Sequence, residues 1–240
     1  MRILGFDTAT PATAVALLDT GTGAIREGRD DPPPGARPRH TTTLMPLVLA
    51  QLDALGVGWD QIDRIAVGVG PGTFTGLRIG VATARALARA RAIGLVGVST
   101  LHALARGALD EPGDHDAVLA VIDARRGEVF AAGWTVEEVA AAGAAPLLEP
   151  RPQPPDELAR ELPALGRSWL AVGNGAVEFR QALERSGARI LDDDSRRNRV
   201  SAVEHCRLAA ALEPKPAEGI RPEYLRLPDA EISLRAARQS

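Results

Sequence analysis

The order of predicted elements constrains the fold most, because it starts twice in the same way. Alternating or continuous apolar runs predict strands, and apolar residues at helical spacing predict helices. In chain order, hairpin strands come first and are followed by helices that alternate with strands. In the first half, strands are predicted at residues 2–6, 14–19, 24–29, 62–70 and 95–99, and helices at 41–55, 75–92 and 101–109. A second hairpin then begins at residues 117–124 and 128–134. Two hairpin starts favour two α/β lobes over one doubly wound sheet, although no sequence repeat accompanies them.

Composition excludes several functional classes. With 240 residues, the chain is long enough for one large or two small domains. The net charge of −3 creates no strong field for nucleic acid or membrane, so RNA contact would be local or partner-supplied. The single cysteine, Cys206, excludes an internal disulfide. We expect a cytoplasmic protein without a membrane segment, because neither a secretory signal nor a long apolar run is present.

A glycine-rich loop joins strand 62–70 to helix 75–92 and reads GVGPGTFTGLRIGV. Such a strand–turn–helix can bind an anion through free N–H groups. However, a P-loop needs lysine after its last glycine, and a dinucleotide loop needs GxGxxG rather than the GxGxxxG found here. We therefore favour a loop that allows tight strand–helix packing. The residues that could still contact an anion or nucleotide are Gly72, Thr73 and Thr75.

Two turns that begin with an aspartate, Asp7 and Asp123, are further candidates for binding a ligand. Asp7 could order a hydrated cation, but an Asx-type turn is the favoured interpretation. The second hairpin carries Arg125 and Arg126 at its tip, which either grip a phosphate or carboxylate or are simply solvated. After strand 168–172, residues 173–175 form a strand–helix turn in which we expect Asn174 to take positive φ. The four histidines are never four residues apart, so no metal site is expected.

Helix 75–92 carries a basic stripe. Arg78, Arg85 and Arg89 are spaced seven and four residues apart and therefore share one face. The stripe could contact RNA phosphate or an acidic partner. A solvated helix face is the favoured alternative.

Helix 41–55 has an apolar arc wider than a one-sided surface helix needs. We expect its threonines to cap it and Pro46 to lie in its first turn. One stripe consists of Leu44, Leu47, Val48 and Leu55, and a second of Met45, Leu49 and Leu52. Either the lobe buries both stripes, or the second one waits for a partner. The predicted partner-interface residues are His40, Met45, Leu49 and Leu52.

The string GPGTFTGLRIG, residues 70–80, closely resembles the hallmark of the bacterial TsaB family, also called YeaZ. The resemblance extends in family order over ILGFDTATP, VSTLHALA, VIDARRGEVF, GNGA and PEYLR. Residues 32–38 and 136–167 match nothing in the family pattern. The similarity therefore covers most of the chain.

The resemblance implies an actin/Hsp70-like (ASKHA) α/β fold of two lobes, each a mixed sheet flanked by helices. Residues 1–106 would form the partner-docking lobe and residues 107–240 the second lobe, with the last helix packing back on the first. Members dimerise with the transferase TsaD, joined by the ATPase TsaE. TsaD modifies N6 of adenosine 37 in tRNAs that read codons beginning with A.

A non-catalytic activating subunit is thus implied, with no cofactor of its own, since ATP and Mg²⁺ belong to the partners. Contact with tRNA would come through the complex, and a homodimer of the isolated chain is left open. The residues agree: the turn from Asp7 lacks the glycine that nucleotide-binding relatives carry, and Leu44 follows His40 where the catalytic relative has His-x-x-x-His. The alternatives are an actin-like ATPase or metallopeptidase, which hydrolysis assays would detect, and a polymerising structural module, which light scattering would detect.

Overall fold

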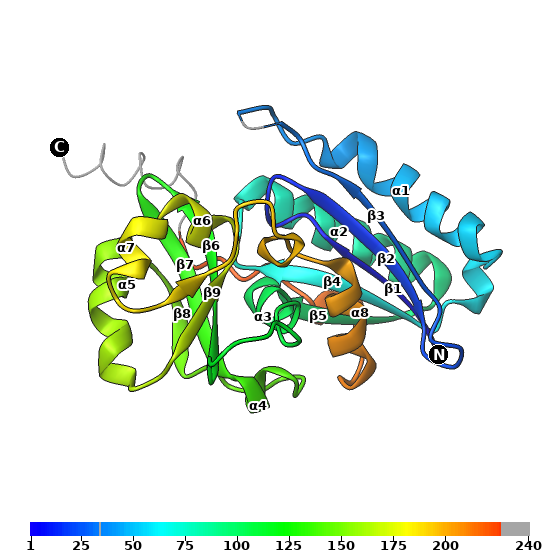
Figure 1. The fold of residues 1–240 in the computed structure, drawn as a ribbon. Coiled ribbons are helices and arrows are strands. Elements are labelled where there is room, and N and C mark those ends of the chain that lie inside the picture. The colour runs from blue at the N-terminus through cyan, green and yellow to red at the C-terminus, as the bar shows by residue number, and fades with distance from the viewer. Residues whose placement is uncertain (34, 227–240) are drawn as a thin grey trace.

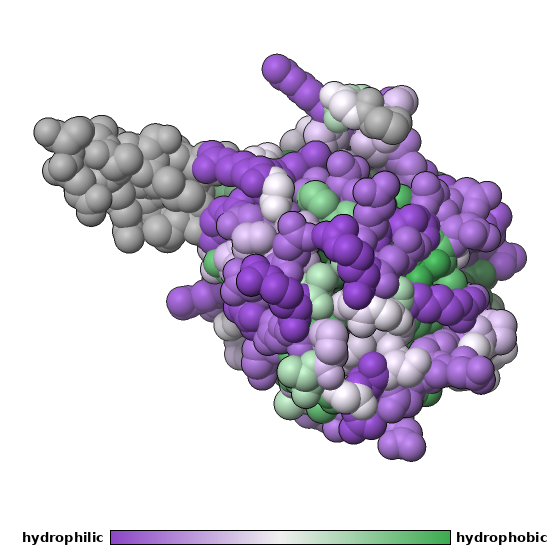
Figure 2. Space-filling model, turned by 60° about the vertical axis from the view of Figure 1, so that its left-hand side comes forward, coloured by the Kyte–Doolittle hydropathy of each residue, from purple (hydrophilic) through white to green (hydrophobic). Residues whose placement is uncertain are grey.

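A computed structural model describes residues 1–33 and 35–226, which form two α/β lobes side by side (Figure 1). Residues 227–240 of the predicted second lobe lie outside the described residues. The face drawn in Figure 2 is mostly hydrophilic, with small hydrophobic areas among the polar side chains. Apolar side chains gather instead in four buried clusters, which cover the two faces of each sheet.

The first lobe contains a five-stranded mixed sheet in the order β3-β2-β1-β4-β5. Its strands are β1 (Arg2–Asp7), β2 (Thr13–Asp19), β3 (Ile25–Asp30), β4 (Arg64–Gly70) and β5 (Gly94–Ser99). The hairpin strands β1, β2 and β3 are antiparallel, whereas β4 and β5 extend β1 in parallel. Parallel pairing brings the carboxyl ends of β1, β4 and β5 to one edge, which is where the glycine-rich loop begins.

Helices cover both faces of this sheet. The helices α1 (His40–Leu55) and α2 (Phe74–Arg91) pack on one face and α8 (Ala202–Ala210) on the other. The helix α3 (Thr100–Arg106) lies between the two sheets. Ser201 caps α8, as its side chain accepts the N–H of Val203. Gly5 allows α8 to approach, because a Cβ there would lie 2.6 Å from the Cys206 sulfur.

The second sheet repeats the first in the order β10-β9-β6-β7-β8, with an antiparallel half and a parallel half. Its strands are β6 (Ala117–Arg125), β7 (Glu128–Thr135), β8 (Leu148–Gln153), β9 (Trp169–Val172) and β10 (Arg189–Ile190). Its helices are α4 (Val136–Val139), α5 (Pro155–Glu161), α6 (Asn174–Glu178) and α7 (Arg180–Glu184). The matching order confirms two lobes, each with a mixed sheet.

Three local predictions were wrong. The helix predicted at 41–55 begins at His40 without a side-chain cap, because Thr42 and Thr43 donate back to the carbonyl of Arg39. Pro46 therefore lies in its second turn. The sequence AVEFRQALER, residues 176–185, predicts a single helix, but the chain divides there into α6 and α7 at Phe179, whose φ and ψ are −109° and 29°. The strand β8 was not predicted, because it contains prolines that only an edge strand accepts.

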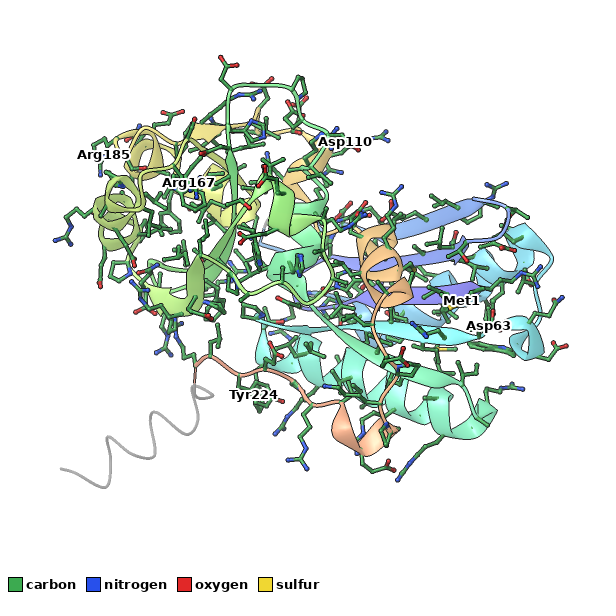
Figure 3. All side chains as sticks on the ribbon, turned by 90° about the horizontal axis from the view of Figure 1, so that it is seen from below. Met1, Asp63, Asp110, Arg167, Arg185 and Tyr224 are labelled. Atoms are coloured by element: carbon green, nitrogen blue, oxygen red, sulfur yellow. The ribbon has the colours of Figure 1, made fainter. Side chains whose placement is uncertain are left out.

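After α8, a C-terminal segment (residues 211–226) runs back across the first lobe to the second (Figure 3). Ile220 is 5% exposed in the core of the first lobe, and Leu225 packs on the core of the second. Between them, the N–H of Glu223 donates to the carbonyl of Val69 at 2.7 Å. The segment thus connects the two lobes directly beside the glycine-rich loop.

Candidate functional site

The turn at the end of β1 is buried and fully used by the protein itself. Asp7 is 1% exposed, and its Oδ1 accepts the N–H of Ala9 at 2.7 Å, the Asx-type bond favoured from the sequence. Its Oδ2 accepts the hydroxyl of Thr100 at 2.8 Å. These contacts leave the carboxylate occupied where a cation-binding role would need open oxygens.

His205, from α8, completes this buried site. Its Nε2 lies 3.0 Å from Oδ2 of Asp7, and its Nδ1 lies 3.0 Å from the carbonyl oxygen of Ser201. Burial alone would raise the pKa of Asp7, but pairing with His205 outweighs it and lowers this pKa below its usual value. Burial likewise opposes charge on His205, but Asp7 raises the pKa of this imidazole. The pair is therefore an ion pair that fastens α8 to the first sheet.

Sequence reasoning missed this role of His205. Asp7 and His205 come from opposite ends of the chain, and the helix that carries His205 has an ordinary amphipathic pattern. The only local hint lies in β4: a Cβ at Gly68 would sit 1.8 Å from Oδ2 of Asp7 and 3.1 Å from Nε2 of His205. Glycine is needed there because the pair occupies the space.

The glycine-rich loop packs on the β1–β2 turn. A Cβ at Gly72 would lie 2.3 Å from the carbonyl oxygen of Ala9, and one at Gly76 would lie 1.9 Å from that of Thr8. The N–H of Thr73 donates to Ala9 at 2.7 Å, and the hydroxyl of Thr8 donates to Gly76 at 2.7 Å. Close strand–helix packing, the interpretation favoured from the motif, therefore accounts for these glycines. Thr75 is exposed on the first turn of α2.

The corresponding turn in the second lobe is exposed. Arg125, Arg126 and Gly127 take left-handed φ values of 65°, 59° and 74° at the tip of the β6–β7 hairpin. The N–H of Arg125 donates to Oδ1 of Asp123 at 2.7 Å, and its guanidinium lies 3.3 Å from the same carboxylate. Both arginines are exposed, so this tip remains the more accessible of the two aspartate turns.

The turn at residues 173–175 is also explained by packing. Gly173, not Asn174, takes the positive φ, at 114°. A Cβ on Gly173 would lie 2.1 Å from the carbonyl oxygen of Val121. Asn174 instead begins α6 and accepts the N–H of Asp123 at 3.3 Å. The prediction for Asn174 was wrong because close approach to β6 requires glycine one position earlier.

The basic stripe of α2 meets the C-terminal segment. The guanidinium of Arg78 lies 4.0 Å from the ring centre of Phe74, and its Nε donates to the Tyr224 hydroxyl at 3.2 Å. Arg89 pairs with Glu218 of the same segment. Arg85 is half-buried. Two of the three arginines thus bind the protein's own chain.

The two apolar stripes predicted on α1 are distributed differently in the structure. Leu44, Val48 and Leu52 are each at most 3% exposed and face the core. Leu49 is 46% exposed, and Met45 beside it is half-buried. The placement of Leu52 in a partner-facing stripe was therefore wrong, because a helical spacing of four aligns it with Leu44 and Val48.

His40 is also buried, contrary to its assignment to the partner surface. It is 3% exposed, and its Nδ1 lies 2.9 Å from the Thr13 hydroxyl. Burial lowers the pKa of His40. This histidine therefore supports the start of α1 from within.

Within the described part of the chain, no group of three or more His, Cys, Asp and Glu side chains is arranged to hold a metal ion. The helices of that same part include none with both the length and the apolarity that a membrane crossing requires.

Comparisons with known proteins agree with this geometry. The family model of TsaD, described as tRNA N6-adenosine threonylcarbamoyltransferase, matches residues 32–146. The tRNA threonylcarbamoyladenosine biosynthesis protein TsaB of Escherichia coli (strain K12) is 35% identical over 242 residues, covering 94% of this chain and 95% of that protein. The protein of the same name from Bacillus subtilis is 33% identical over 54% of this chain and 53% of its own length.

Solved structures show the same relationship. YeaZ from Pseudomonas aeruginosa superposes with a TM-score of 0.75 and 32% identity, covering 93% of this chain and 99% of that one. A ROK hexokinase from Thermus thermophilus, with a TM-score of 0.51 and 12% identity over 87% and 98% of the two chains, shares the fold alone. Sequence, sheet order and superposition lead to one conclusion: the chain belongs to the TsaB (YeaZ) family and has the actin/Hsp70-like (ASKHA) fold.

Proposed function

We propose that this chain acts in the biosynthesis of threonylcarbamoyladenosine in tRNA, as a non-catalytic subunit that activates the transferase TsaD by forming a heterodimer with it. The names of the relatives support the pathway. Similarity of residues 32–146 to TsaD itself supports pairing between related lobes. The proposal includes the ATPase TsaE as a third component and adenosine 37 as the modified base.

The proposed heterodimer is supported mainly by the exposed apolar part of α1. Leu49 has 46% of its surface exposed, with Met45 one turn away on the same side. An exposed leucine beside a half-buried methionine is favourable when a partner covers both. We therefore place the TsaD contact on this side of α1.

The buried turn supports a subunit without its own chemistry. Asp7 is held by Thr100 and His205, and the glycine-rich loop is occupied by the β1–β2 turn. In the catalytic relative a second histidine follows four residues after the first, whereas here Leu44 is a core residue. ATP and Mg²⁺ would accordingly be used by the partners.

The docking surface is tested by the pair Met45→Glu with Leu49→Glu. We expect loss of the heterodimer in size-exclusion chromatography with a melting temperature near normal, because the two charges would be buried only in the complex. A matched control is Ala50→Glu with Ala54→Glu, two exposed positions on the other side of α1. Leu44→Glu with Val48→Glu should unfold the lobe. An intact complex with the first pair would contradict this docking surface.

The proposed activating but non-catalytic role is tested by reconstitution with TsaD, TsaE, tRNA and threonylcarbamoyl-adenylate, omitting one component at a time. Modified adenosine should require this chain, whereas the chain alone should hydrolyse neither ATP nor peptides. Chelators should leave its melting temperature unchanged. Turnover that survives purification would contradict the non-catalytic role.

A further inference from the structure

A groove of about 640 Å³ lies where the two lobes meet, on the side of β3 and α8. It is lined by β3, the end of α3, and the segment from the short helix η3 (Arg196–Asn198) to the start of α8. Its charged lining residues are Arg29, Arg196, Arg197, Arg199, Glu27 and Glu204. The arginines exceed the glutamates by two in a chain whose net charge is −3.

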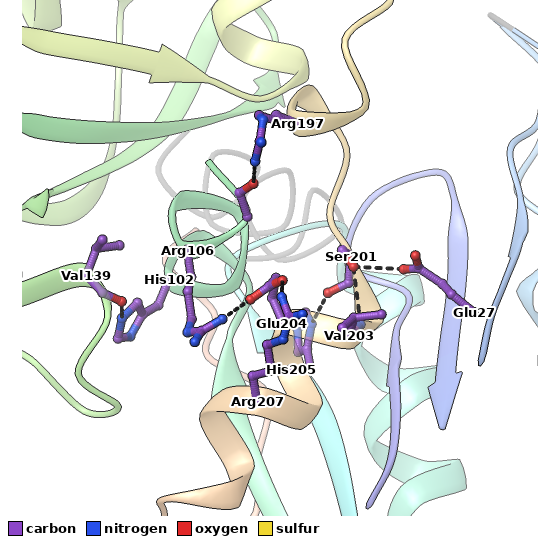
Figure 4. Close-up of polar contacts among 11 residues, drawn as sticks. Glu27, His102, Arg106, Val139, Arg197, Ser201, Val203, Glu204, His205 and Arg207 are labelled. Atoms are coloured by element: carbon purple, nitrogen blue, oxygen red, sulfur yellow. Dashed lines mark hydrogen bonds and ion pairs between the residues drawn. The ribbon is translucent and has the colours of Figure 1, made fainter. Parts of the chain in front are cut away.

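Both glutamates already have partners other than the arginines of the groove lining, but only Glu204 is paired with cations (Figure 4). Glu204 is 6% exposed, and its two oxygens pair with Arg106 and Arg207. Glu27 accepts the Ser201 hydroxyl at 2.8 Å and the N–H of Ala202 at 3.1 Å. Neither carboxylate therefore needs an arginine of the groove lining as its partner.

Two of the four arginines are fixed by the protein. Arg29 donates to both oxygens of Asp31, at 3.0 and 2.8 Å, and to the carbonyl of Val200 at 2.6 Å. Arg197 donates to the carbonyl of Gly107 at 2.6 Å and pairs with Glu111 at 2.8 Å. These two arginines are therefore held in place and compensated by carboxylates, so they shape the groove without adding free positive charge.

The other two arginines keep donors for a ligand. Arg196 is exposed, and its guanidinium makes no hydrogen bond or ion pair with another residue that the structure describes. Arg199 has 49% of its side chain exposed and lies 3.6 Å from Asp31, whose oxygens already accept from Arg29. Acidic residues 192–194 precede this stretch, but none of them lines the groove, and Asp193 pairs with Arg180 at 2.6 Å.

We propose that this groove binds the phosphodiester backbone of RNA, with Arg196 and Arg199 contacting phosphate oxygens. The planar guanidinium matches a phosphate with two parallel hydrogen bonds. The described residues of the groove lining include no aromatic side chain for stacking on a base, and contacts to phosphate position RNA without specifying its sequence. This inference rests on the proposed function, in which the substrate is tRNA, and assigns part of its binding to this chain.

The test measures binding of an unmodified tRNA transcript at several salt concentrations, with the full chain alone and in the heterodimer. Arg196→Glu with Arg199→Glu should weaken binding about tenfold or more, and the slope of log K against log salt should become shallower by about two, because each lost phosphate contact removes about 0.9. The control is Arg37→Glu with Arg221→Glu, which changes the charge equally at exposed positions outside the groove. If the glutamate variant folds poorly, the milder pair Arg196→Ala with Arg199→Ala replaces it, and it should weaken tRNA binding in the same direction.

An unchanged salt slope, or an equal loss in the control pair, would overturn the inference. So would a groove variant that weakens the complex with TsaD but not the affinity for tRNA, since the groove would then dock an acidic protein surface. Failure of the proposed function is recognised separately: the wild-type chain would not bind TsaD or support modification, whatever its own affinity for tRNA.

Discussion

The two lobes contain the same aspartate turn in opposite surroundings. Asp7 ends β1 and Asp123 lies near the end of β6, the central strands of their sheets. Each accepts an N–H from the residue two positions later at 2.7 Å. In the first lobe α8 and the glycine-rich loop bury the turn, whereas in the second the adjacent hairpin tip is exposed.

This difference shows that one local geometry serves two purposes, depending on what packs over it. Under α8, the second oxygen of Asp7 holds Thr100 and His205 and so ties together distant segments. At the hairpin tip, the carboxylate of Asp123 bonds only locally: it accepts the N–H of Arg125 and lies 3.3 Å from the guanidinium of Arg125, whose side chain is 66% exposed. The buried turn joins segments that are distant in sequence, whereas the exposed hairpin tip presents its arginine side chains to solvent.

The largest expected effect comes from removing the aspartate charge in each lobe. Asp7→Asn should cost about 3–5 kcal/mol in the free energy of unfolding, because it leaves His205 buried without its counter-ion. Asp123→Asn should cost less than about 1 kcal/mol, since its pair is at the surface. Urea denaturation of both variants measures the difference. Similar losses in the free energy of unfolding for the two variants would mean that burial does not make the Asp7 turn more important for stability than the Asp123 turn.

A smaller contrast is expected from adding one methyl group to a glycine of each region. Gly76→Ala should cost about 3 kcal/mol, because the new Cβ would lie 1.9 Å from the carbonyl oxygen of Thr8. Gly127→Ala should cost about 1 kcal/mol, since only its left-handed φ of 74° resists the change. Thermal unfolding compares the two. If Gly76→Ala is tolerated, the loop is not packed as tightly as described.

The smallest expected effect is a dependence on pH that belongs to the first lobe alone. His205 has a folded pKa above 6.5, so its contribution is fully present below pH 6.5 and is lost as pH rises through the folded pKa. Asp7 has a folded pKa below 3.8, so its contribution is present above pH 3.8 and is lost as pH falls through the folded value. The pair therefore stabilises the lobe most between these limits.

Accordingly, the stability difference between the wild-type chain and His205→Gln should be largest from about pH 4 to 6.5 and should shrink at alkaline pH. Gly127→Ala serves as the control, because its cost involves no titrating group and should stay constant. Other buried histidines titrate in both proteins, and their effects cancel in the difference; these are His40 and His102. A difference for His205→Gln that grows above pH 7 would contradict the ion pair.

The sequence alone was sufficient for most of the elements and for their order, although it missed β8. Hydrophobic periodicity located most strands and helices, and the repeated hairpin start predicted two lobes that the matching sheet orders confirm. The glycine-rich loop was interpreted as a packing device because its spacing fits neither phosphate motif, and its glycines do allow close packing on the β1–β2 turn. These features are local, since they depend on side chains within a few residues of one another.

Tertiary structure decided which of these residues are accessible. The pairing of Asp7 with His205 and the burial of His40 and Leu52 depend on contacts between segments far apart in sequence, which no local pattern encodes. The same holds for the groove, whose lining includes Arg29 from β3 and Arg196 from η3, far apart in sequence. Periodicity predicts that a residue faces one side of its helix or strand, but burial depends on which other element packs there, and only the folded chain brings those elements together.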